Sequence, residues 1–116
     1  MANKQALQML QQEQVDEFNR WVKQRRKKGK SGVDLDDQDL SGLKLWGVDL
    51  RGAHLNGSNL RKTDLTDADL RSARLRQADL RKAVLDQADL SGADLRRAKC
   101  DGASFHKAKV RDVKGL

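Results

Sequence analysis

The stretch ADLRSARLRQADLRKAVLDQADLSGADL, residues 68–95, decides the fold because every fifth residue in it is a leucine. Thirteen leucines keep this spacing from Leu35 to Leu95, and three other apolar residues continue it. Leucines five apart share no helix face, and in a strand they would alternate between the two faces of a sheet. The chain must therefore turn once per repeat and wind into a solenoid with inward leucines. The predicted core residues are Leu35, Leu40, Leu45, Leu50, Leu55, Leu60, Leu65, Leu70, Leu75, Leu80, Leu85, Leu90, Leu95, Cys100, Phe105 and Val110.

The residues around each leucine fit a tight corner. A small residue stands two positions before the leucine, as at Ala53, Ser58, Thr63 and Ala68, and Asp or Asn usually stands one position before it. The short side chains of Asp and Asn bond nearby backbone groups in turns. The segments ADLRS, ADLRK, ADLSG and ADLRR are therefore variants of one unit, A(D/N)LXX.

These units strongly resemble the pentapeptide-repeat family, over roughly residues 33–113. The resemblance implies an all-β solenoid: a right-handed quadrilateral parallel β-helix of about four coils, with four pentapeptides in each coil. Residues twenty apart would then stack at the strand spacing of about 4.8 Å. In that register Asp49, Asp69 and Asp89 would form an acidic ladder, with Arg51 and Arg71 beside it. Such a ladder is most simply a solvated surface in which opposite charges compensate each other.

Residues 1–30 are predicted to form a capping helix with a basic tail, ahead of a repeat domain at residues 31–116. Apolar residues recur at helical spacing, and the glycines of KKGKSG end the pattern. The pattern is also compatible with a helix that is interrupted near residues 14–16, in which case Asp16 would cap the second helical segment. Solenoids need terminal caps because their end coils expose apolar groups and strand edges. The FNRW motif resembles helices that precede the repeats in other bacterial members of the family. The residues predicted to dock the cap are Phe18, Trp21, Val22 and, in the first coil, Trp46.

The net charge of +7 is concentrated at the start of the chain. Residues 1–30 hold eight basic and three acidic side chains, whereas residues 31–116 hold sixteen and fourteen. The basic run KQRRKKGK, residues 23–30, precedes an acidic first coil, so we favour mutual neutralisation of the two. Binding of nucleic acid or an anionic surface is the functional alternative. Nucleic acid is the less favoured partner because the chain lacks interleaved aromatic residues and any known motif.

No enzymatic or metal-binding pattern is evident, so we predict a non-enzyme without catalytic residues, cofactor or metal. His54 and His106 occupy outward positions without the spacing of metal ligands. Turn chemistry accounts for the many aspartates. The single cysteine, Cys100, cannot form an internal disulfide, and neither a signal peptide nor a membrane span is visible. A cytoplasmic location is therefore expected.

The favoured function is a protein-interaction scaffold with an unknown protein partner. The alternative is mimicry of DNA: the family's quinolone-resistance members resemble duplex DNA in size and acidity and bind DNA gyrase. The slightly basic repeats of this chain disfavour that function. We expect the last coil to be exposed and to stack on a second copy as a homodimer, with an acidic protein as the competing partner. The predicted interaction end consists of Phe105, Lys107, Lys109, Val110, Arg111 and Val113.

Overall fold

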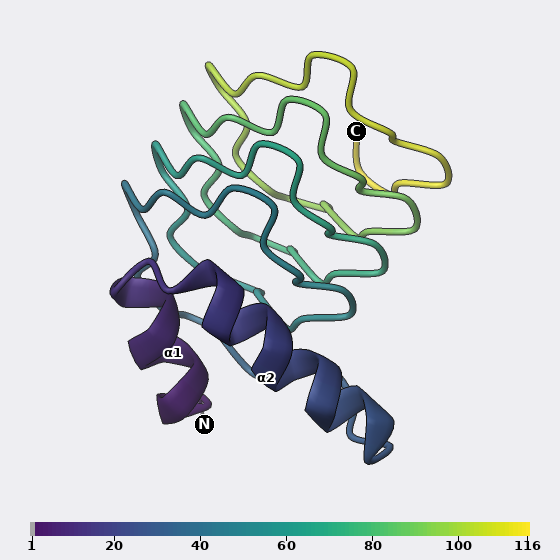
Figure 1. Ribbon diagram of the computed structural model, residues 1–116. Coiled ribbons are helices and arrows are strands. Elements are labelled where there is room, and N and C mark those ends of the chain that lie inside the picture. The colour runs from purple at the N-terminus through teal and green to yellow at the C-terminus, as the bar shows by residue number, and fades with distance from the viewer. Residues whose placement is uncertain (1) are drawn as a thin grey trace.

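The computed structural model describes residues 2–116 and shows two helices at one end of a stack of coils (Figure 1). The strands of the coils are single bridged residues, one in each pentapeptide. Thirteen parallel bridges within the described residues each join positions twenty apart, from Asp34 with His54 to Asp94 with Lys114. A turn every five residues and a repeat of twenty give each coil four sides. The structure is therefore a quadrilateral parallel β-helix, which is the architecture that the family resemblance implied.

Each corner depends on a left-handed backbone conformation two residues after the leucine. Gly42 has a φ of 70° at such a corner, whereas Lys62 and Asp67 adopt 59° and 60° despite their Cβ atoms. Left-handed φ is unfavourable for a residue with a side chain. Hydrogen bonds between coils hold these corners, as where the N–H of Lys62 donates to the carbonyl of Arg81 at 3.1 Å. Polar residues therefore occupy corners within the stack, and Arg97, Lys107 and Asp112 keep the same left-handed φ where no coil follows among the described residues.

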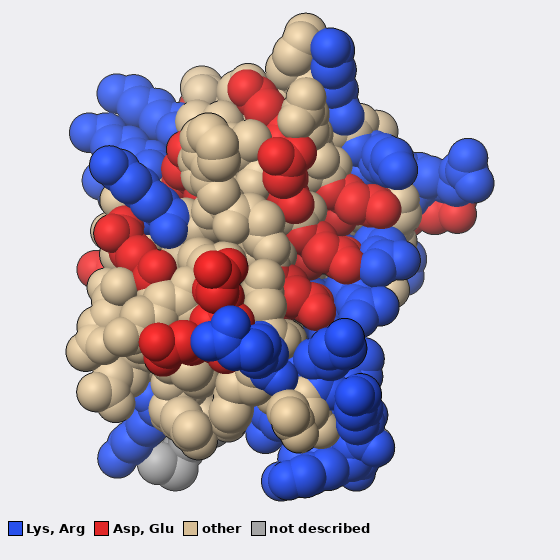
Figure 2. Space-filling view, viewed as in Figure 1, with Lys and Arg blue, Asp and Glu red and all other residues tan. Residues whose placement is uncertain are grey.

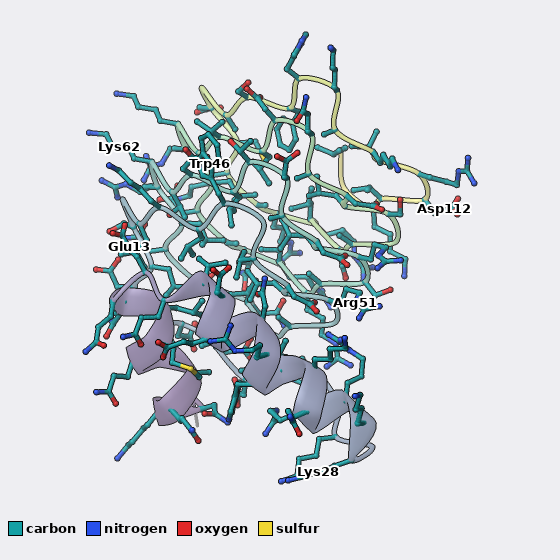
Figure 3. The ribbon with its side chains drawn as sticks, viewed as in Figure 1. Glu13, Lys28, Trp46, Arg51, Lys62 and Asp112 are labelled. Carbon is teal, nitrogen blue, oxygen red and sulfur yellow. The ribbon has the colours of Figure 1, made fainter. Side chains whose placement is uncertain are left out.

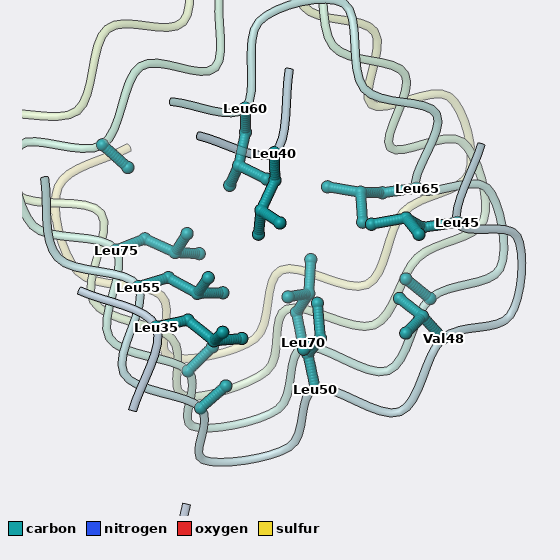
Figure 4. Packing of buried hydrophobic residues seen from close by; sticks show 14 of the residues in the cluster. Leu35, Leu40, Leu45, Val48, Leu50, Leu55, Leu60, Leu65, Leu70 and Leu75 are labelled. Atoms are coloured by element: carbon teal, nitrogen blue, oxygen red, sulfur yellow. The ribbon is translucent and has the colours of Figure 1, made fainter. Parts of the chain in front are cut away.

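The leucines form a continuous core along the axis of the stack. All thirteen from Leu35 to Leu95 are at most 1% exposed, and those twenty apart lie above one another (Figure 4). Ser58 and Thr63 replace alanine at the small inward position and are also fully buried. Their hydroxyls donate to carbonyls of core leucines at 2.7 Å, so neither hydroxyl is left unsatisfied. The position two residues before each leucine therefore points inward in every repeat, and a small polar side chain can occupy it when its hydroxyl is hydrogen-bonded.

The N-terminal segment contains two helices, α1 (Lys4–Gln11) and α2 (Val15–Lys27). Asn3 caps α1, where its side chain accepts a hydrogen bond from the N–H of Ala6 at 3.0 Å. The N-cap of α2 is Gln14, so the expectation that Asp16 is the cap is wrong. Asp16 instead lies in the first turn of α2, where its negative charge is favourable beside the N-terminal end of the helix dipole.

The last coil differs from the others in its burial. Cys100 and Phe105 are only half-buried, and Val110 is 45% exposed. Val110 occupies the same repeat position as Leu70, so its exposure does not come from its own orientation. Among the described residues no coil follows it, and an inward side chain needs a coil on both sides to lose contact with water. The prediction that Val110 is a core residue is therefore wrong.

Candidate interaction surfaces

The helices lie across the first coil with their apolar face toward its interior (Figure 1). Ala6, Leu10 and Phe18 are fully buried, Val22 is 7% exposed, and all four belong to the same cluster as the core leucines. Trp21 is half-buried, with its ring 5.9 Å from that of Phe18. Fully burying a side chain such as Leu or Phe contributes roughly 1.5–3 kcal/mol. The helices therefore remove the first coil's interior from water.

Polar groups of the helical segment bond to backbone groups at the edge of the first coil. The N–H of Asn3 donates to the carbonyl of Asp34 at 2.8 Å. Between the helices, Glu13 accepts a hydrogen bond from the N–H of Lys44 at 2.6 Å. In later coils the equivalent groups pair with a neighbouring coil, as Asp64 N–H does with the carbonyl of Leu43. The helical segment thus supplies partners that a preceding coil would otherwise supply.

Asn19, within the FNRW motif, makes the most specific of these contacts. Its side-chain oxygen accepts from the N–H of Asp49 at 2.8 Å, and its side-chain nitrogen donates to the carbonyl of Gly47 at 3.0 Å. One amide group therefore satisfies both a donor and an acceptor of the coil edge. The sequence predicted docking through the aromatic residues of FNRW, whereas Asn19, which stands between them, was not among the predicted docking residues.

Trp46 does not form the predicted docking contact. Its side chain is 62% exposed, and its indole N–H donates to the carboxylate of Asp64 in the next coil. The helix contacts the adjacent Gly47 instead, whose backbone carbonyl accepts the hydrogen bond from the Asn19 side chain. The contact is made by backbone because an outward side chain in the first coil projects sideways, whereas the helices lie over the open end.

The basic run at residues 23–30 pairs with the first coil through Arg26. The guanidinium of Arg26 donates to both carboxylate oxygens of Asp49 at 3.0 Å. This ion pair joins the basic run to the acidic first coil at Asp49, a bridged residue on one side of the coil. In Figure 3 the labelled Arg51 lies on the side of the coil above the C-terminal end of α2, which the labelled Lys28 marks.

From Asp49 a column of alternating charges continues along one face of the coil. Arg51 lies 3.5 Å from Asp49 and 3.4 Å from Asp69, while Arg71 lies 2.7 Å from Asp69 and 4.0 Å from Asp89. The structure thus contains the ladder expected from the twenty-residue register, with each arginine between two carboxylates. Pairs exposed to this degree contribute about 0–1 kcal/mol each. The column is an ordered charged surface more than a source of stability.

Other faces carry similar ion pairs, and these lower the pKa of their carboxyl groups. Asp79 lies 2.6 Å from Arg81 and 3.7 Å from Arg61. The hydrogen bond from Arg81 is the main cause that lowers the pKa of Asp79 to about 2. The hydrogen bond from Arg96, at 2.7 Å, likewise holds the pKa of Asp94 well below its ordinary value. These carboxylates stay ionised at neutral pH and are unsuited to acid catalysis there.

The predicted interaction end is only partly assembled into one surface. A hollow of about 510 Å³ brings together Lys109, Val110 and Arg111 beside Asp89. Lys107 is exposed, whereas Phe105 and Val113 are half-buried against the core. The backbone N–H groups of Cys100, Phe105 and Val110 donate to no backbone carbonyl within the described residues. This end therefore combines unpaired strand edges, partly exposed apolar groups and positive charge.

Within residues 2–116, no three His, Cys, Asp or Glu side chains come together in a way that could hold a metal ion. Burial, with a smaller contribution from the charge of Asp101, raises the pKa of the Cys100 thiol and so disfavours a reactive thiolate. No helix in this part of the chain has the length and apolar character needed to cross a membrane.

Comparison with known proteins identifies the repeats. The family model of pentapeptide repeats matches residues 34–71 and 73–112, in eight copies. Among solved structures, HetL from the cyanobacterium Nostoc sp. strain PCC 7120, a pentapeptide repeat protein involved in heterocyst differentiation regulation, is 31% identical. The match covers 79% of this chain and 44% of HetL, with a TM-score of 0.47. No curated protein matches the sequence.

Two further solved structures are similar over part of the chain. The pentapeptide repeat protein alr5209 from Nostoc PCC 7120 is 40% identical over 65% of this chain and 62% of its own, with a TM-score of 0.44. A trypsin-treated QnrB1, a plasmid-mediated fluoroquinolone resistance protein, is 19% identical over 72% and 61%, with a TM-score of 0.30. The chain therefore spans less than two thirds of each of the three structures.

Proposed function

Because the chain belongs to the pentapeptide-repeat family, we propose that it is a non-enzymatic scaffold that binds a protein partner through its ordered side-chain columns. The observation that carries this proposal is the column of alternating Asp and Arg from Asp49 to Asp89, whose charges the coil holds in register. A rigid array loses little conformational entropy on binding, and solenoids commonly present such arrays to partners. The family implies a right-handed coil. With one unpaired cysteine, the protein suits a reducing cytoplasm.

We assign residues 1–30 to a cap and residues 31–116 to a repeat domain of about four coils. Two kinds of contact support the cap. Ala6, Leu10 and Phe18 cover the first coil's interior, and Asn19 bonds to its exposed edge. A coil edge without such partners would be open to pairing with other chains.

The C-terminal end is the proposed surface for a second copy of the chain or for an acidic protein. Residues 96–116 carry seven basic and two acidic side chains, so two copies meeting there repel each other. A homodimer should consequently weaken as salt is removed, and an acidic partner should bind more tightly. Sedimentation across a salt series separates the two. A monomer at every salt concentration excludes the homodimer, and a dimer that strengthens at low salt contradicts the charge argument.

Inhibition of DNA gyrase by DNA mimicry is the alternative function. The repeats hold sixteen basic and fourteen acidic side chains in residues 31–116, and a mimic of duplex DNA requires a strongly negative surface. We therefore expect no potent inhibition of supercoiling. Direct binding of duplex DNA should likewise be lost at physiological salt. Sub-micromolar inhibition would favour mimicry, and salt-resistant DNA binding would favour a nucleic-acid function.

The scaffold proposal is tested by affinity capture from the source cell at low and high salt with three variants of equal charge change. One variant alters the column (R51Q and R71Q), one the C-terminal end (K109Q and R111Q), and one a separate corner (K62Q and K82Q). A specific partner should be retained by the corner variant and lost from one of the other two. Proteins captured equally by all variants, or no captured protein, would contradict the proposal.

A further inference from the structure

A hollow of about 430 Å³ lies where the end of α2 meets the coil, and its charged lining is entirely basic. Arg25, Arg26 and Lys30 reach it from the helical segment, and Arg51 and Arg71 reach it from the coil. Ser31 and Ser72 add hydroxyl groups to the same lining. Lys and Arg side chains gather over this part of the surface in Figure 2. Five cations from two parts of the chain therefore converge on one concave site.

Nearby carboxylates neutralise only part of this charge. Asp49 pairs with Arg26 and Arg51, and Asp69 pairs with Arg51 and Arg71. Asp89 lies 4.0 Å from Arg71, but none of these three aspartates lines the hollow. The guanidinium of Arg25 lies 5.0 Å from the ring centroid of Trp21.

Two guanidinium nitrogens remain buried without a hydrogen-bond acceptor. They are the Nε atoms of Arg25, from α2, and of Arg51, from the coil, and both residues line the hollow. A buried polar group normally has a partner, so an unpaired N–H indicates an acceptor that the protein itself does not supply. For Arg51 the neighbouring carboxylates are within ion-pair distance but not placed for a hydrogen bond.

The dipole of α2 explains only part of the basic lining. Cations in the last turn of a helix are favourable, and Arg25 and Arg26 lie in the last turn of α2. That effect does not account for Arg51 and Arg71, which come from successive coils. The backbone also meets closely here, since a Cβ on Gly32 would lie 1.8 Å from the carbonyl oxygen of Gly52. Gly32 thus allows the chain leaving α2 to come close to the coil that carries Arg51.

We propose that this hollow binds a phosphate group, either free inorganic phosphate or the phosphate of a small organic ester. A phosphate dianion offers several acceptors, and arginine presents paired N–H donors that match them. The volume exceeds that of one phosphate group and falls in the range of small-ligand sites. Because both α2 and the coil line the site, bound phosphate stabilises the docked helix.

The test is a titration of the complete chain with inorganic phosphate at constant ionic strength, followed by backbone amide NMR. The amides of Ser31, Gly52 and Ser72 should shift in a saturable way, whereas that of Gly102 in the last coil should not. A parallel titration with phenyl phosphate distinguishes the two sources. Tighter binding of the ester indicates an organic phosphate as the ligand, and equal or tighter binding of inorganic phosphate indicates free phosphate.

Two variants with the same charge change distinguish specific binding of phosphate in the hollow from nonspecific attraction of anions to the positively charged protein. Lys30→Gln removes an exposed lining cation and should weaken phosphate binding about threefold to tenfold. Lys107→Gln is the control, because Gln77 and Gln87 already occupy the equivalent corner in other repeats. Uniform shifts over the whole surface, no saturable shift, or equal weakening by both variants would overturn the proposal.

Discussion

The two ends of the coil are built from the same pentapeptide repeat, but one end is covered by the helices and the other is exposed to solvent. At the helix-covered end, Leu35 and Leu50 are at most 1% exposed, and edge N–H groups bond to Glu13 and Asn19. At the other end Val110 is 45% exposed. The repeat position alone therefore does not determine burial. Each coil is protected by whatever lies on its two sides, so the ends decide how the whole solenoid behaves.

The largest effect should come from placing a charge at one repeat position in the middle and at the open end. Leu70→Asp buries an unpaired carboxylate in the core and should abolish folding. Val110→Asp, in the same column, should lower the free energy of unfolding by less than about 1 kcal/mol because water already reaches it. Circular dichroism during urea unfolding measures both. Equal losses would show that burial follows the repeat position after all.

Amide hydrogen exchange compares the two edges directly. The N–H groups of Lys44 and Asp49 bond to side chains of the helical segment, whereas those of Phe105 and Val110 find no backbone acceptor in the described part of the chain. Protection factors at the covered edge should be higher by on the order of 100-fold. Similar protection at both edges in a monomeric sample would contradict the contrast.

A smaller effect is expected from removing one polar contact between the helical segment and the first coil. Asn19→Ala leaves the N–H of Asp49 and the carbonyl of Gly47 without their partner and should cost about 1–2 kcal/mol of unfolding free energy. Arg20→Ala, an exposed neighbour on α2, is the control and should change it by less than about 0.5 kcal/mol. If both variants unfold at the same urea concentration, the edge contacts do not stabilise the coil.

The sequence predicted the regular part of the molecule better than its covered end. A five-residue period constrains every repeat in the same way, so the inward leucines follow from spacing alone. The Asp49–Asp69–Asp89 register also required the four-sided coil that the family resemblance implied. Docking of the helices has no such period. It depends on where the chain reversal at Glu13 places Asn19 relative to the first coil. This long-range geometry cannot be inferred from spacing, so docking was predicted at Trp46, whereas the contact is made by the neighbouring Gly47.

The smallest expected effect concerns the charged column between the two ends. Arg71→Ala should change the unfolding free energy by no more than about 0.5 kcal/mol at low salt and by less at high salt, because Arg71 is half exposed. Thermal melts at two salt concentrations measure this. A loss larger than that of Asn19→Ala would mean that the surface column, and not the covering helices, maintains the coil.

The twenty-residue register separates what the core requires from what the surface displays. An insertion of one pentapeptide after Ser72 would keep every later leucine inside, since all four sides have the same inward pattern. The same insertion would rotate every later outward residue by a quarter turn, so Val84 would take the place of Asp89 above Asp69. Duplication of single repeats therefore reshuffles the molecular surface while the interior is unaffected, which lets such a chain acquire new faces without redesigning its core.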